Sequence, residues 1–307
     1  MKATRDGFGD QLVESAKNNK NIIGLSADLG KATKINKFAE VYPERFFECG
    51  IAENNMIGIA SGLAAEGFKP FITSFAAFLT GKYDTIRCSI AYPNESVVIV
   101  GSHGGMAIGK DGVTQMGLED VAIMRALPNM IILNPATYIE AKAITKYLCE
   151  TKLTQPHYLR IGRQPVKEVF DENYIFDINE GYHVLNNDTD ELVLSTGCIL
   201  PEVLEATKDL DVTVVNVPLL KPISLNLKKY ITYFSWKNIF TVEDHSIIGG
   251  LGSITAEILA ESGSISKLTR IGLNDIFPES GPTEKLYEKY GLSSNKIREK
   301  ILNEKKF

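Results

Sequence analysis

The chain has 307 residues and a formal net charge of −5, from 33 Lys and Arg against 38 Asp and Glu; 44% of its residues are hydrophobic and 23% are charged. These values are typical of a globular protein with two domains, and an acidic balance without a basic stripe argues against a nucleic-acid partner. No run approaches the roughly 18 apolar residues of a membrane span, the first residues lack the apolar core of a secretion signal, and the four scattered cysteines favour neither a zinc site nor a disulfide framework. We therefore expect a cytoplasmic protein that binds no membrane.

Short apolar runs alternate with helix-length segments along the chain. Continuous apolar runs are typical of strands covered on both faces, as in a parallel sheet. The runs lie at 22–25, 97–100, 130–133, 192–194, 212–217 and 239–242, and the helical segments at 138–149, 200–208, 253–261 and 284–290. This pattern predicts an α/β protein with two three-layer α/β/α domains and mainly parallel sheets. The polar, weakly periodic segment 166–190 predicts a linker between domains at 1–165 and 191–307.

A single charge interrupts the apolar face of a predicted helix over 51–65. The positions i, i+4, i+7 and i+11 of that face are Glu53, Ile57, Ala60 and Ala64. Small residues fill much of the rest, so we expect this helix to pack at a dense junction. Burial disfavours the charged form of a carboxyl, which suits a group that holds and hands over a proton. Stabilisation of the helix N-terminus by Glu53 is the alternative.

Two phenylalanines follow this helix. Phe75 and Phe78 are three residues apart, and we expect them to face the same way on one helix. Packing in the core is the default use of such a pair, and a stacking wall for a flat cofactor ring is the sharper alternative.

A glycine-rich loop at 101–112 follows the predicted strand at 97–100 and contains His103 and Asp111. Ligands bind beyond the carboxyl ends of parallel strands, so this loop is well placed for chemistry. It is neither a phosphate-binding loop of the Walker type nor a dinucleotide fingerprint. The alternative is a surface loop with a solvated histidine.

Two further segments carry groups that suit anions. Arg160 and Arg163 end a strand-like segment, where an arginine could bind a phosphate or make a surface ion pair. The segment 243–253 follows a strand and opens a helix, but Thr255 replaces the third glycine of a dinucleotide fingerprint. Packing or a domain contact is the preferred interpretation of the latter segment.

The order of these motifs resembles that of the transketolase family. The runs that carry the resemblance lie at 3–5, 26–29, 50–56, 62–71, 111–114, 126–130, 249–253 and 290–292. They cover nearly the whole chain and imply a pyrimidine-binding domain followed by a transketolase C-terminal domain. The family's diphosphate-binding domain, with a Gly-Asp-Gly motif and a downstream Asn that hold a divalent metal such as Mg²⁺, has no counterpart in the sequence.

The resemblance therefore implies the C-terminal section of a split transketolase. A separate N-terminal-section subunit would supply the metal and the diphosphate site, in a hetero-oligomer of the α2β2 kind. Together they would transfer a two-carbon ketol unit from a ketose to an aldose, with thiamine diphosphate as the cofactor that carries the chemistry.

The resemblance also implies roles for individual residues around the cofactor. Glu53 would hydrogen-bond the pyrimidine ring nitrogen in its protonated form and thereby favour the imino tautomer, which removes the proton of the thiazolium ring. Phe75 and Phe78 would pack around the pyrimidine, with Gly81 in place of a third aromatic residue. Asp28 and Leu29 would lie close to the cofactor.

A second set of residues would bind the sugar substrates. Arg5, His103 and Arg163 match positions that grip the phosphate of the acceptor, and His103 joins Glu53 as a catalytic residue. Asp111 matches the residue that reads the C2 hydroxyl of the acceptor. Gln115 stands where many transketolases have a donor-side histidine. An amide donates and accepts hydrogen bonds but is no acid near neutral pH, so this departure bears on either the choice of donor or the efficiency of its cleavage.

Three rival interpretations remain at this stage. The β subunit of a 2-oxo acid dehydrogenase has the same domains, but a 2-oxo acid needs no set such as Arg5, His103 and Arg163. A half of a 1-deoxyxylulose-phosphate synthase-like enzyme is a second rival. A non-catalytic scaffold or regulatory subunit is the third, and the retained Glu53 speaks against it.

Overall fold

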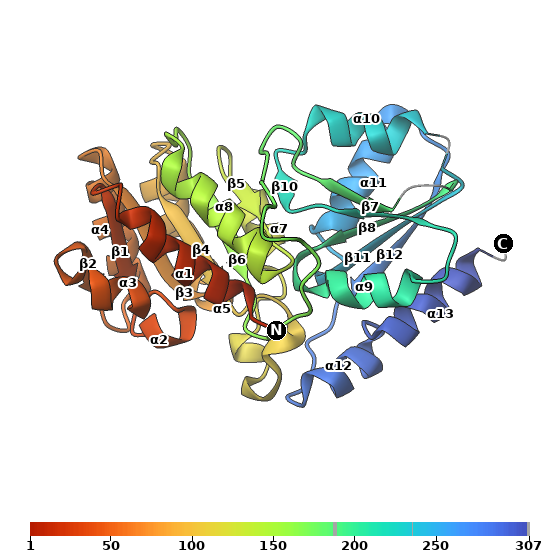
Figure 1. Cartoon of the computed structure of the whole chain (residues 1–307), viewed down its shortest axis with the longest axis horizontal. Coiled ribbons are helices and arrows are strands. Elements are labelled where there is room, and N and C mark those ends of the chain that lie inside the picture. Colours follow the sequence, from red (N-terminus) through yellow and green to blue (C-terminus); the bar gives the residue numbers. More distant parts are fainter. Residues whose placement is uncertain (187–188, 235, 306–307) are drawn as a thin grey trace.

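The computed structural model describes residues 1–186, 189–234 and 236–305, and it consists of two sheets that lie side by side with helices packed around them (Figure 1). The first sheet has seven strands in the order β10-β5-β6-β4-β3-β1-β2. Six run parallel: β1 (Ile22–Ser26), β2 (Phe46–Glu48), β3 (Lys69–Phe75), β4 (Val98–Ser102), β5 (Ile131–Leu133) and β6 (His157–Ile161). The seventh, β10 (Leu219–Lys221), comes from the second half of the chain and pairs antiparallel with β5. The second half therefore contributes an edge strand to the first sheet.

The second sheet has five strands in the order β12-β11-β8-β9-β7. Its parallel strands are β8 (Glu191–Thr196), β9 (Thr213–Asn216), β11 (Asn238–Ser246) and β12 (Lys267–Leu273). At one edge, β7 (His183–Asn186) pairs antiparallel with β9. β7 lies within the segment 166–190 that was predicted as a linker.

Helices cover both faces of each sheet. On the first sheet, one face carries α1 (Thr4–Ala16), α3 (Asn36–Val41) and α8 (Tyr138–Glu150), and the other carries α4 (Glu53–Ala65), α6 (Tyr83–Ile86) and α7 (Asp120–Arg125). On the second sheet, one face carries α9 (Leu200–Thr207), α12 (Thr283–Tyr290) and α13 (Ser294–Glu304), and the other carries α10 (Leu225–Tyr233) and α11 (Leu251–Ser262). The short helices between these are α2 (Gly30–Thr33), α5 (Ala76–Thr80), η1 (Pro43–Arg45), η2 (Arg87–Ala91), η3 (Met106–Asp111), η4 (Val113–Gln115) and η5 (Gly197–Ile199).

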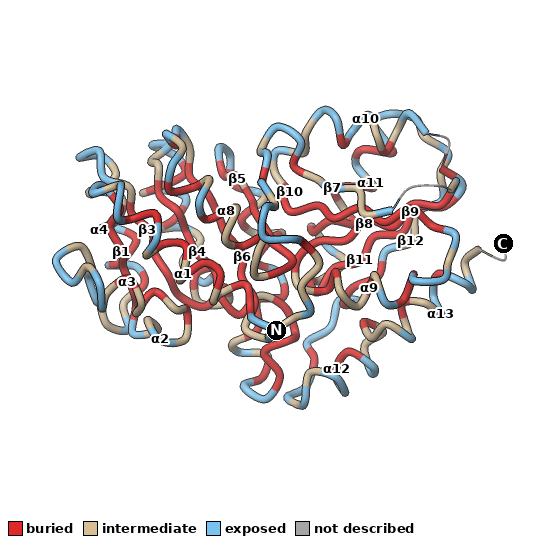
Figure 2. The backbone as a smooth tube through the Cα atoms, in the orientation of Figure 1, coloured by how far each residue is buried: buried red, intermediate tan, exposed pale blue. Residues whose placement is uncertain are grey.

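Both faces of the sheets are buried because side chains alternate along each strand. In β4, Val98 and Val100 pack into one apolar cluster and Ile99 packs into the other. Figure 2 shows the same distribution, with the central strands buried and most of the exposed backbone in loops, edge strands and outer helices. Burial on both faces explains why these strands are continuous apolar runs in the sequence.

The predicted α/β class is confirmed, with two sheets that are mainly parallel. One local assignment is wrong. Phe75 is the last residue of β3, which pairs with both β1 and β4, so only Phe78 lies in a helix. The boundaries at 165 and 191 stay a prediction. Of the helices in the described part of the chain, none has the length and apolar character that crossing a membrane requires.

Candidate functional site

The predicted site residues gather at the carboxyl edge of the first sheet. Four of them end or closely follow a parallel strand: Asp28 after β1, Phe75 at the end of β3, His103 directly after β4 and Arg163 after β6. These strands are consecutive in the sheet, in the order β6-β4-β3-β1. With neighbouring strands about 4.8 Å apart, the row from Arg163 to Asp28 spans about 14 Å. This edge is where ligands bind in open parallel sheets.

Glu53 is the first residue of α4, and its side chain is only 7% exposed. Oε1 of its carboxyl accepts a hydrogen bond of 3.0 Å from the hydroxyl of Ser74, the penultimate residue of β3. Ala52 at the N-cap of α4 makes no side-chain cap, and the hydrogen bond of the Glu53 carboxyl goes to the sheet. Ile57 and Ala60 on the same face are fully buried, as the apolar stripe predicts.

The opposite face of α4 is open in this chain. Gly58 and Gly62 are exposed, and a Cβ added at either position would meet no atom within 4 Å. Ile51 and Ile59 beside them are 85% and 36% exposed. The dense junction expected around these small residues is therefore not formed within the described parts of this chain.

Aromatic rings connect Glu53's neighbourhood to His103. The rings of Phe75 and Phe78 stack with centroids 5.3 Å apart, and the ring of His103 lies 3.8 Å from that of Phe75. Phe75 directly follows Ser74, the partner of Glu53. Ser74 contacts Glu53 and Phe75 contacts His103, so both side chains lie at the carboxyl end of β3.

His103 is held in an unusual conformation. Its φ of 62° is in the left-handed region, where a non-glycine residue is uncommon and strain of this kind clusters at functional sites. Its side chain is 3% exposed, and Nδ1 lies 2.8 Å from Oγ of Ser102. Burial, together with the positive charges of Arg5 and Arg163, lowers the pKa of His103 from 6.5 to about 3. The imidazole is therefore neutral at physiological pH, and the alternative of a solvated histidine is wrong.

Arg5 and Arg163 approach this imidazole from α1 and from the end of β6. The backbone N–H of Arg5 donates to the carbonyl of Gly162 (3.4 Å), and its Nη1 donates to the carbonyl of Ala32 (2.8 Å). Burial lowers the pKa of Arg5, and within the described part of the chain its buried Nε has no hydrogen-bond partner. A buried guanidinium N–H without a partner is costly and favours an anionic ligand.

Arg163 makes an ion pair with Asp111, which lies at the end of η3. Its Nη1 also donates to the carbonyl of Ile108 over 3.4 Å. Gln115 ends η4 on the same loop and is half-buried. The loop after β4 thus brings His103, Asp111 and Arg163 together.

Asp28 and Leu29 form a turn after β1 that Glu48 connects to the start of α4. Oε1 of Glu48 accepts hydrogen bonds from the amides of Asp28 (2.7 Å) and Gly50 (3.0 Å). The amide of Leu29 donates to Oγ of Ser26 (3.2 Å), and a cavity of about 400 Å³ borders this turn and Glu48. The sequence analysis did not predict a role for Glu48. The only sequence feature that could have indicated one is its position two residues before Gly50.

Two predicted anion sites are filled by the chain itself. Arg160 is buried and its Nε donates to Asp120 over 2.9 Å, so it is neither a phosphate ligand nor a surface ion pair. The carboxylate of Glu243 accepts the amides of Leu251 and Gly252 at the start of α11, each over 2.8 Å. Packing of the segment 243–253 is therefore confirmed over anion binding.

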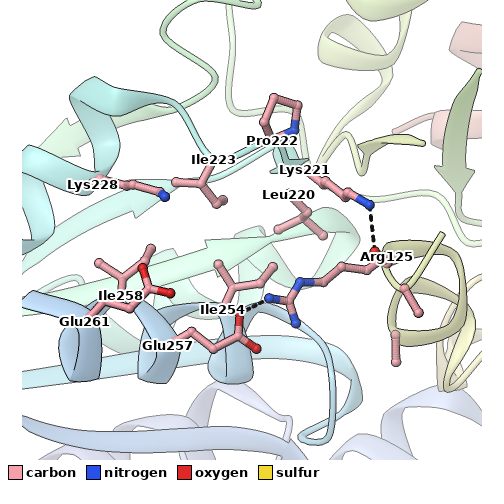
Figure 3. A pocket seen from close by; sticks show the side chains of 12 residues that line it. Arg125, Leu220, Lys221, Pro222, Ile223, Lys228, Ile254, Glu257, Ile258 and Glu261 are labelled. Carbon is pink, nitrogen blue, oxygen red and sulfur yellow. Dashed lines mark hydrogen bonds and ion pairs between the residues drawn. The ribbon is translucent and has the colours of Figure 1, made fainter. Parts of the chain in front are cut away.

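A pocket of about 420 Å³ lies between the two halves, away from these residues (Figure 3). Arg125 makes an ion pair there with Glu257, and Nζ of Lys221 donates to the carbonyl of Arg125 over 2.8 Å. The pocket contains none of the predicted site residues, and the Arg125–Glu257 ion pair joins α7 to α11 across it. In the described residues, no group of three or more His, Cys, Asp or Glu is arranged to hold a metal ion.

Comparisons with known proteins agree on one family. The family model for the transketolase pyrimidine-binding domain matches residues 1–168, and that for the transketolase C-terminal domain matches residues 181–297. A Methanocaldococcus jannaschii protein named for the C-terminal section of a transketolase is 39% identical, over 99% of this chain and 97% of that protein. The 6-deoxy-6-sulfo-D-fructose transketolase subunit of Clostridium sp. MSTE9 is 35% identical, over 95% of this chain and 91% of that subunit. A solved split-gene transketolase, an inactive β4 tetramer, matches with a TM-score of 0.88 and 38% identity, over 99% of this chain and 98% of that one.

Proposed function

Because the chain belongs to the transketolase family, we propose that it is the C-terminal-section subunit of a split, thiamine-diphosphate-dependent transketolase. With its partner it transfers a two-carbon ketol unit from a ketose donor to a phosphorylated aldose acceptor. The observation that carries this proposal is the gathering of buried Glu53, the stacked Phe75–Phe78 pair and His103 at the carboxyl edge of a parallel sheet. We place the enzyme in the cytoplasm, in sugar metabolism, which fits its four unpaired cysteines.

The residues of the first sheet fit the pyrimidine half of thiamine diphosphate. In the described part of the chain, Ser74 is the only hydrogen-bond donor to the Glu53 carboxyl, so that carboxyl retains capacity for a ring nitrogen. Phe75 and Phe78 offer a stacked aromatic wall beside it. When bound, thiamine diphosphate supplies the carbon nucleophile of ketol transfer. Glu53 holds a proton at the pyrimidine nitrogen, and the Asp28–Leu29 turn borders the same ligand.

The cationic end of the row fits the anionic end of a sugar phosphate. Arg5, Arg163 and neutral His103 converge from three elements, and the buried Nε of Arg5 has no hydrogen-bond partner among the described residues. A phosphate would provide acceptors for both guanidinium groups and for the imidazole. Asp111, which is paired with Arg163, would bind a hydroxyl group of the acceptor close to that phosphate. The name of the Clostridium relative also contains an anionic sugar, 6-deoxy-6-sulfo-D-fructose.

A partner subunit would complete the site. The open face of α4, with Gly58, Ile59 and Gly62, lies opposite Glu53 on the same helix, and the exposed Ile51 lies just before the helix. We propose that this face packs against the N-terminal-section subunit in an α2β2 assembly. The divalent metal, Mg²⁺ or a similar ion, and the diphosphate would be held by that partner.

Reconstitution tests the proposal directly. The chain is combined with a candidate partner polypeptide that carries the Gly-Asp-Gly motif, and thiamine diphosphate and Mg²⁺ are added. We expect ketol transfer between a ketose donor and a panel of aldose phosphates by the mixture, and none by either chain alone. Robust turnover by the single chain, or no transfer by a stable complex across the panel, would contradict the proposal.

A further inference from the structure

The loop that carries His103 and Asp111 leaves the first sheet but is held by the second half of the chain. Two consecutive amides of this loop, those of Met106 and Ala107, donate to the carboxylate of Asp244 over 2.8 and 3.3 Å. Asp244 belongs to β11 of the second sheet and is buried. A buried carboxylate that accepts two backbone amides fixes the position and direction of that backbone.

The carboxylate of Asp244 is itself fixed from a third element. The hydroxyl of Tyr287, on α12, donates to Oδ2 of Asp244 over 2.8 Å. The carbonyl of Asp244 accepts Nη2 of Arg160 (2.9 Å), which also donates to the carbonyl of Gly117 (2.8 Å) at the far end of the loop. Both ends of the loop are therefore hydrogen-bonded to one buried polar network.

A second attachment lies closer to Asp111. The hydroxyl of Thr283, the first residue of α12, donates to the carbonyl of Ala107 over 3.1 Å, and the amide of Gly281 donates to the carbonyl of Gly109 over 3.4 Å. The loop approaches so closely that a Cβ at Gly105 would lie 2.3 Å from Oδ2 of Asp244, at a φ of 86°. Only glycine fits there.

These attachments lead directly to the substrate end of the site. The residues held by Asp244 and Thr283 open η3, and Asp111 ends it. Arg163 contacts the middle and the end of the same segment, through the carbonyl of Ile108 and the carboxylate of Asp111. A shift of η3 would therefore move both members of the Arg163–Asp111 pair relative to His103.

We propose that Asp244, Tyr287 and Thr283 are positioning residues through which the C-terminal region sets the substrate loop 103–117. They touch no substrate; they hold η3 so that Asp111 and Arg163 face His103. The inference rests on the proposed function for its effect on turnover. The geometry of the loop is testable without it.

Tyr287→Phe is the sharpest variant because it removes one hydroxyl and leaves the ring in place. Tyr174→Phe is the matched control, since Tyr174 also donates to a buried carboxylate, Glu140 (3.0 Å), and the other partners of Glu140, Ala136 and Asn216, lie outside the loop. Thr283→Val is a second variant at the edge of the contact. Two readouts are used: amide hydrogen exchange of peptides covering 103–117 in the purified chain, and kcat and KM of the reconstituted complex with a phosphorylated acceptor.

We expect faster exchange of the 103–117 peptides in Tyr287→Phe and Thr283→Val, and unchanged exchange there in Tyr174→Phe. Loss of one buried hydrogen bond should raise KM for the acceptor roughly five-fold, with kcat changed much less. Equal protection of the loop in Tyr287→Phe and wild type would overturn the inference, whatever the activity. Faster exchange in a complex without ketol transfer would instead contradict the proposed function alone. If Tyr287→Phe does not fold, the exchange of Thr283→Val decides.

Discussion

The hydroxyl of Ser74 donates a 3.0 Å hydrogen bond to Oε1 of Glu53 and thereby joins the end of β3 to the first turn of α4. This bond occupies one oxygen of the carboxyl and leaves the rest of the group for a ligand. With this single hydrogen bond among the described residues, the carboxyl contributes little to the stability of the fold. An amide oxygen would accept the same hydrogen bond.

Glu53→Gln should therefore separate chemistry from folding. We expect the reconstituted complex to lose nearly all ketol transfer, because the amide cannot give up a proton to a ring nitrogen. The free energy of unfolding should change little, since the Gln oxygen can still accept from Ser74. Initial rates and urea denaturation check the two halves of the prediction. Glu66→Gln, at the exposed end of the same helix, is the control and should be silent. Wild-type rates in Glu53→Gln would remove Glu53 from the mechanism.

Glu48 should support the cofactor site through the hydrogen bonds that its side chain accepts, and not through its charge. One oxygen of its carboxylate accepts the amides of Asp28 and Gly50, which fixes the turn after β1 relative to the start of α4. We expect Glu48→Ala to weaken thiamine diphosphate binding by the complex about ten-fold, by the loss of two such hydrogen bonds. Glu48→Gln should restore most of the affinity because its oxygen accepts both amides. Equal weakening in both variants, measured by titration of the apo complex, would point to charge instead.

Periodicity and order along the chain were enough to predict the fold class and the burial of Glu53. They worked because strands buried on both faces are continuous apolar runs, and because a helix places residues four and seven apart on one face. The same rules failed for Phe75, since a spacing of three is also compatible with a strand end followed by a helix.

Contacts between distant segments could not be predicted in this way. Arg160 and Arg163 are three residues apart in the sequence, yet Arg160 is buried against Asp120 while Arg163 reaches Asp111. The difference depends on which strands are neighbours and on an acid forty residues away. The attachment of the loop to Asp244 was equally invisible, because 138 residues separate Met106 from that side chain.

Arg163→Ala should discriminate between acceptors by their charge. The guanidinium faces His103 and Asp111 at the end of the row that we assign to the phosphate. We expect kcat/KM to fall at least ten-fold for a phosphorylated aldose, as a charge-assisted contact is lost, and much less for the unphosphorylated sugar. Arg125→Ala, which breaks an ion pair with Glu257 away from the site, serves as the control. Equal losses on both acceptors would assign Arg163 a different task.

The charge state of His103 gives a prediction that needs neither partner nor substrate. Burial first, and then Arg5 and Arg163, lowers its pKa from 6.5 to about 3. Between these values the unfolded chain binds a proton at this position that the folded chain does not. The contribution of His103 to stability is therefore fully present above pH 6.5 and is lost as the pH falls towards 3.

Nuclear magnetic resonance of the imidazole checks this directly, since the chain has only four histidines and each signal is assigned by substitution. We expect the His103 signal to stay at its neutral position from pH 8 to pH 5. Arg163→Ala should raise the pKa but leave it below 6.5, because burial is the largest cause of the shift and the charge of Arg5 remains. Inorganic phosphate should also raise it in the wild type, as a bound anion offsets the two arginines. A titration midpoint of His103 near pH 6.5 in the wild type would mean that the imidazole is solvated. That result would contradict the phosphate site proposed around it.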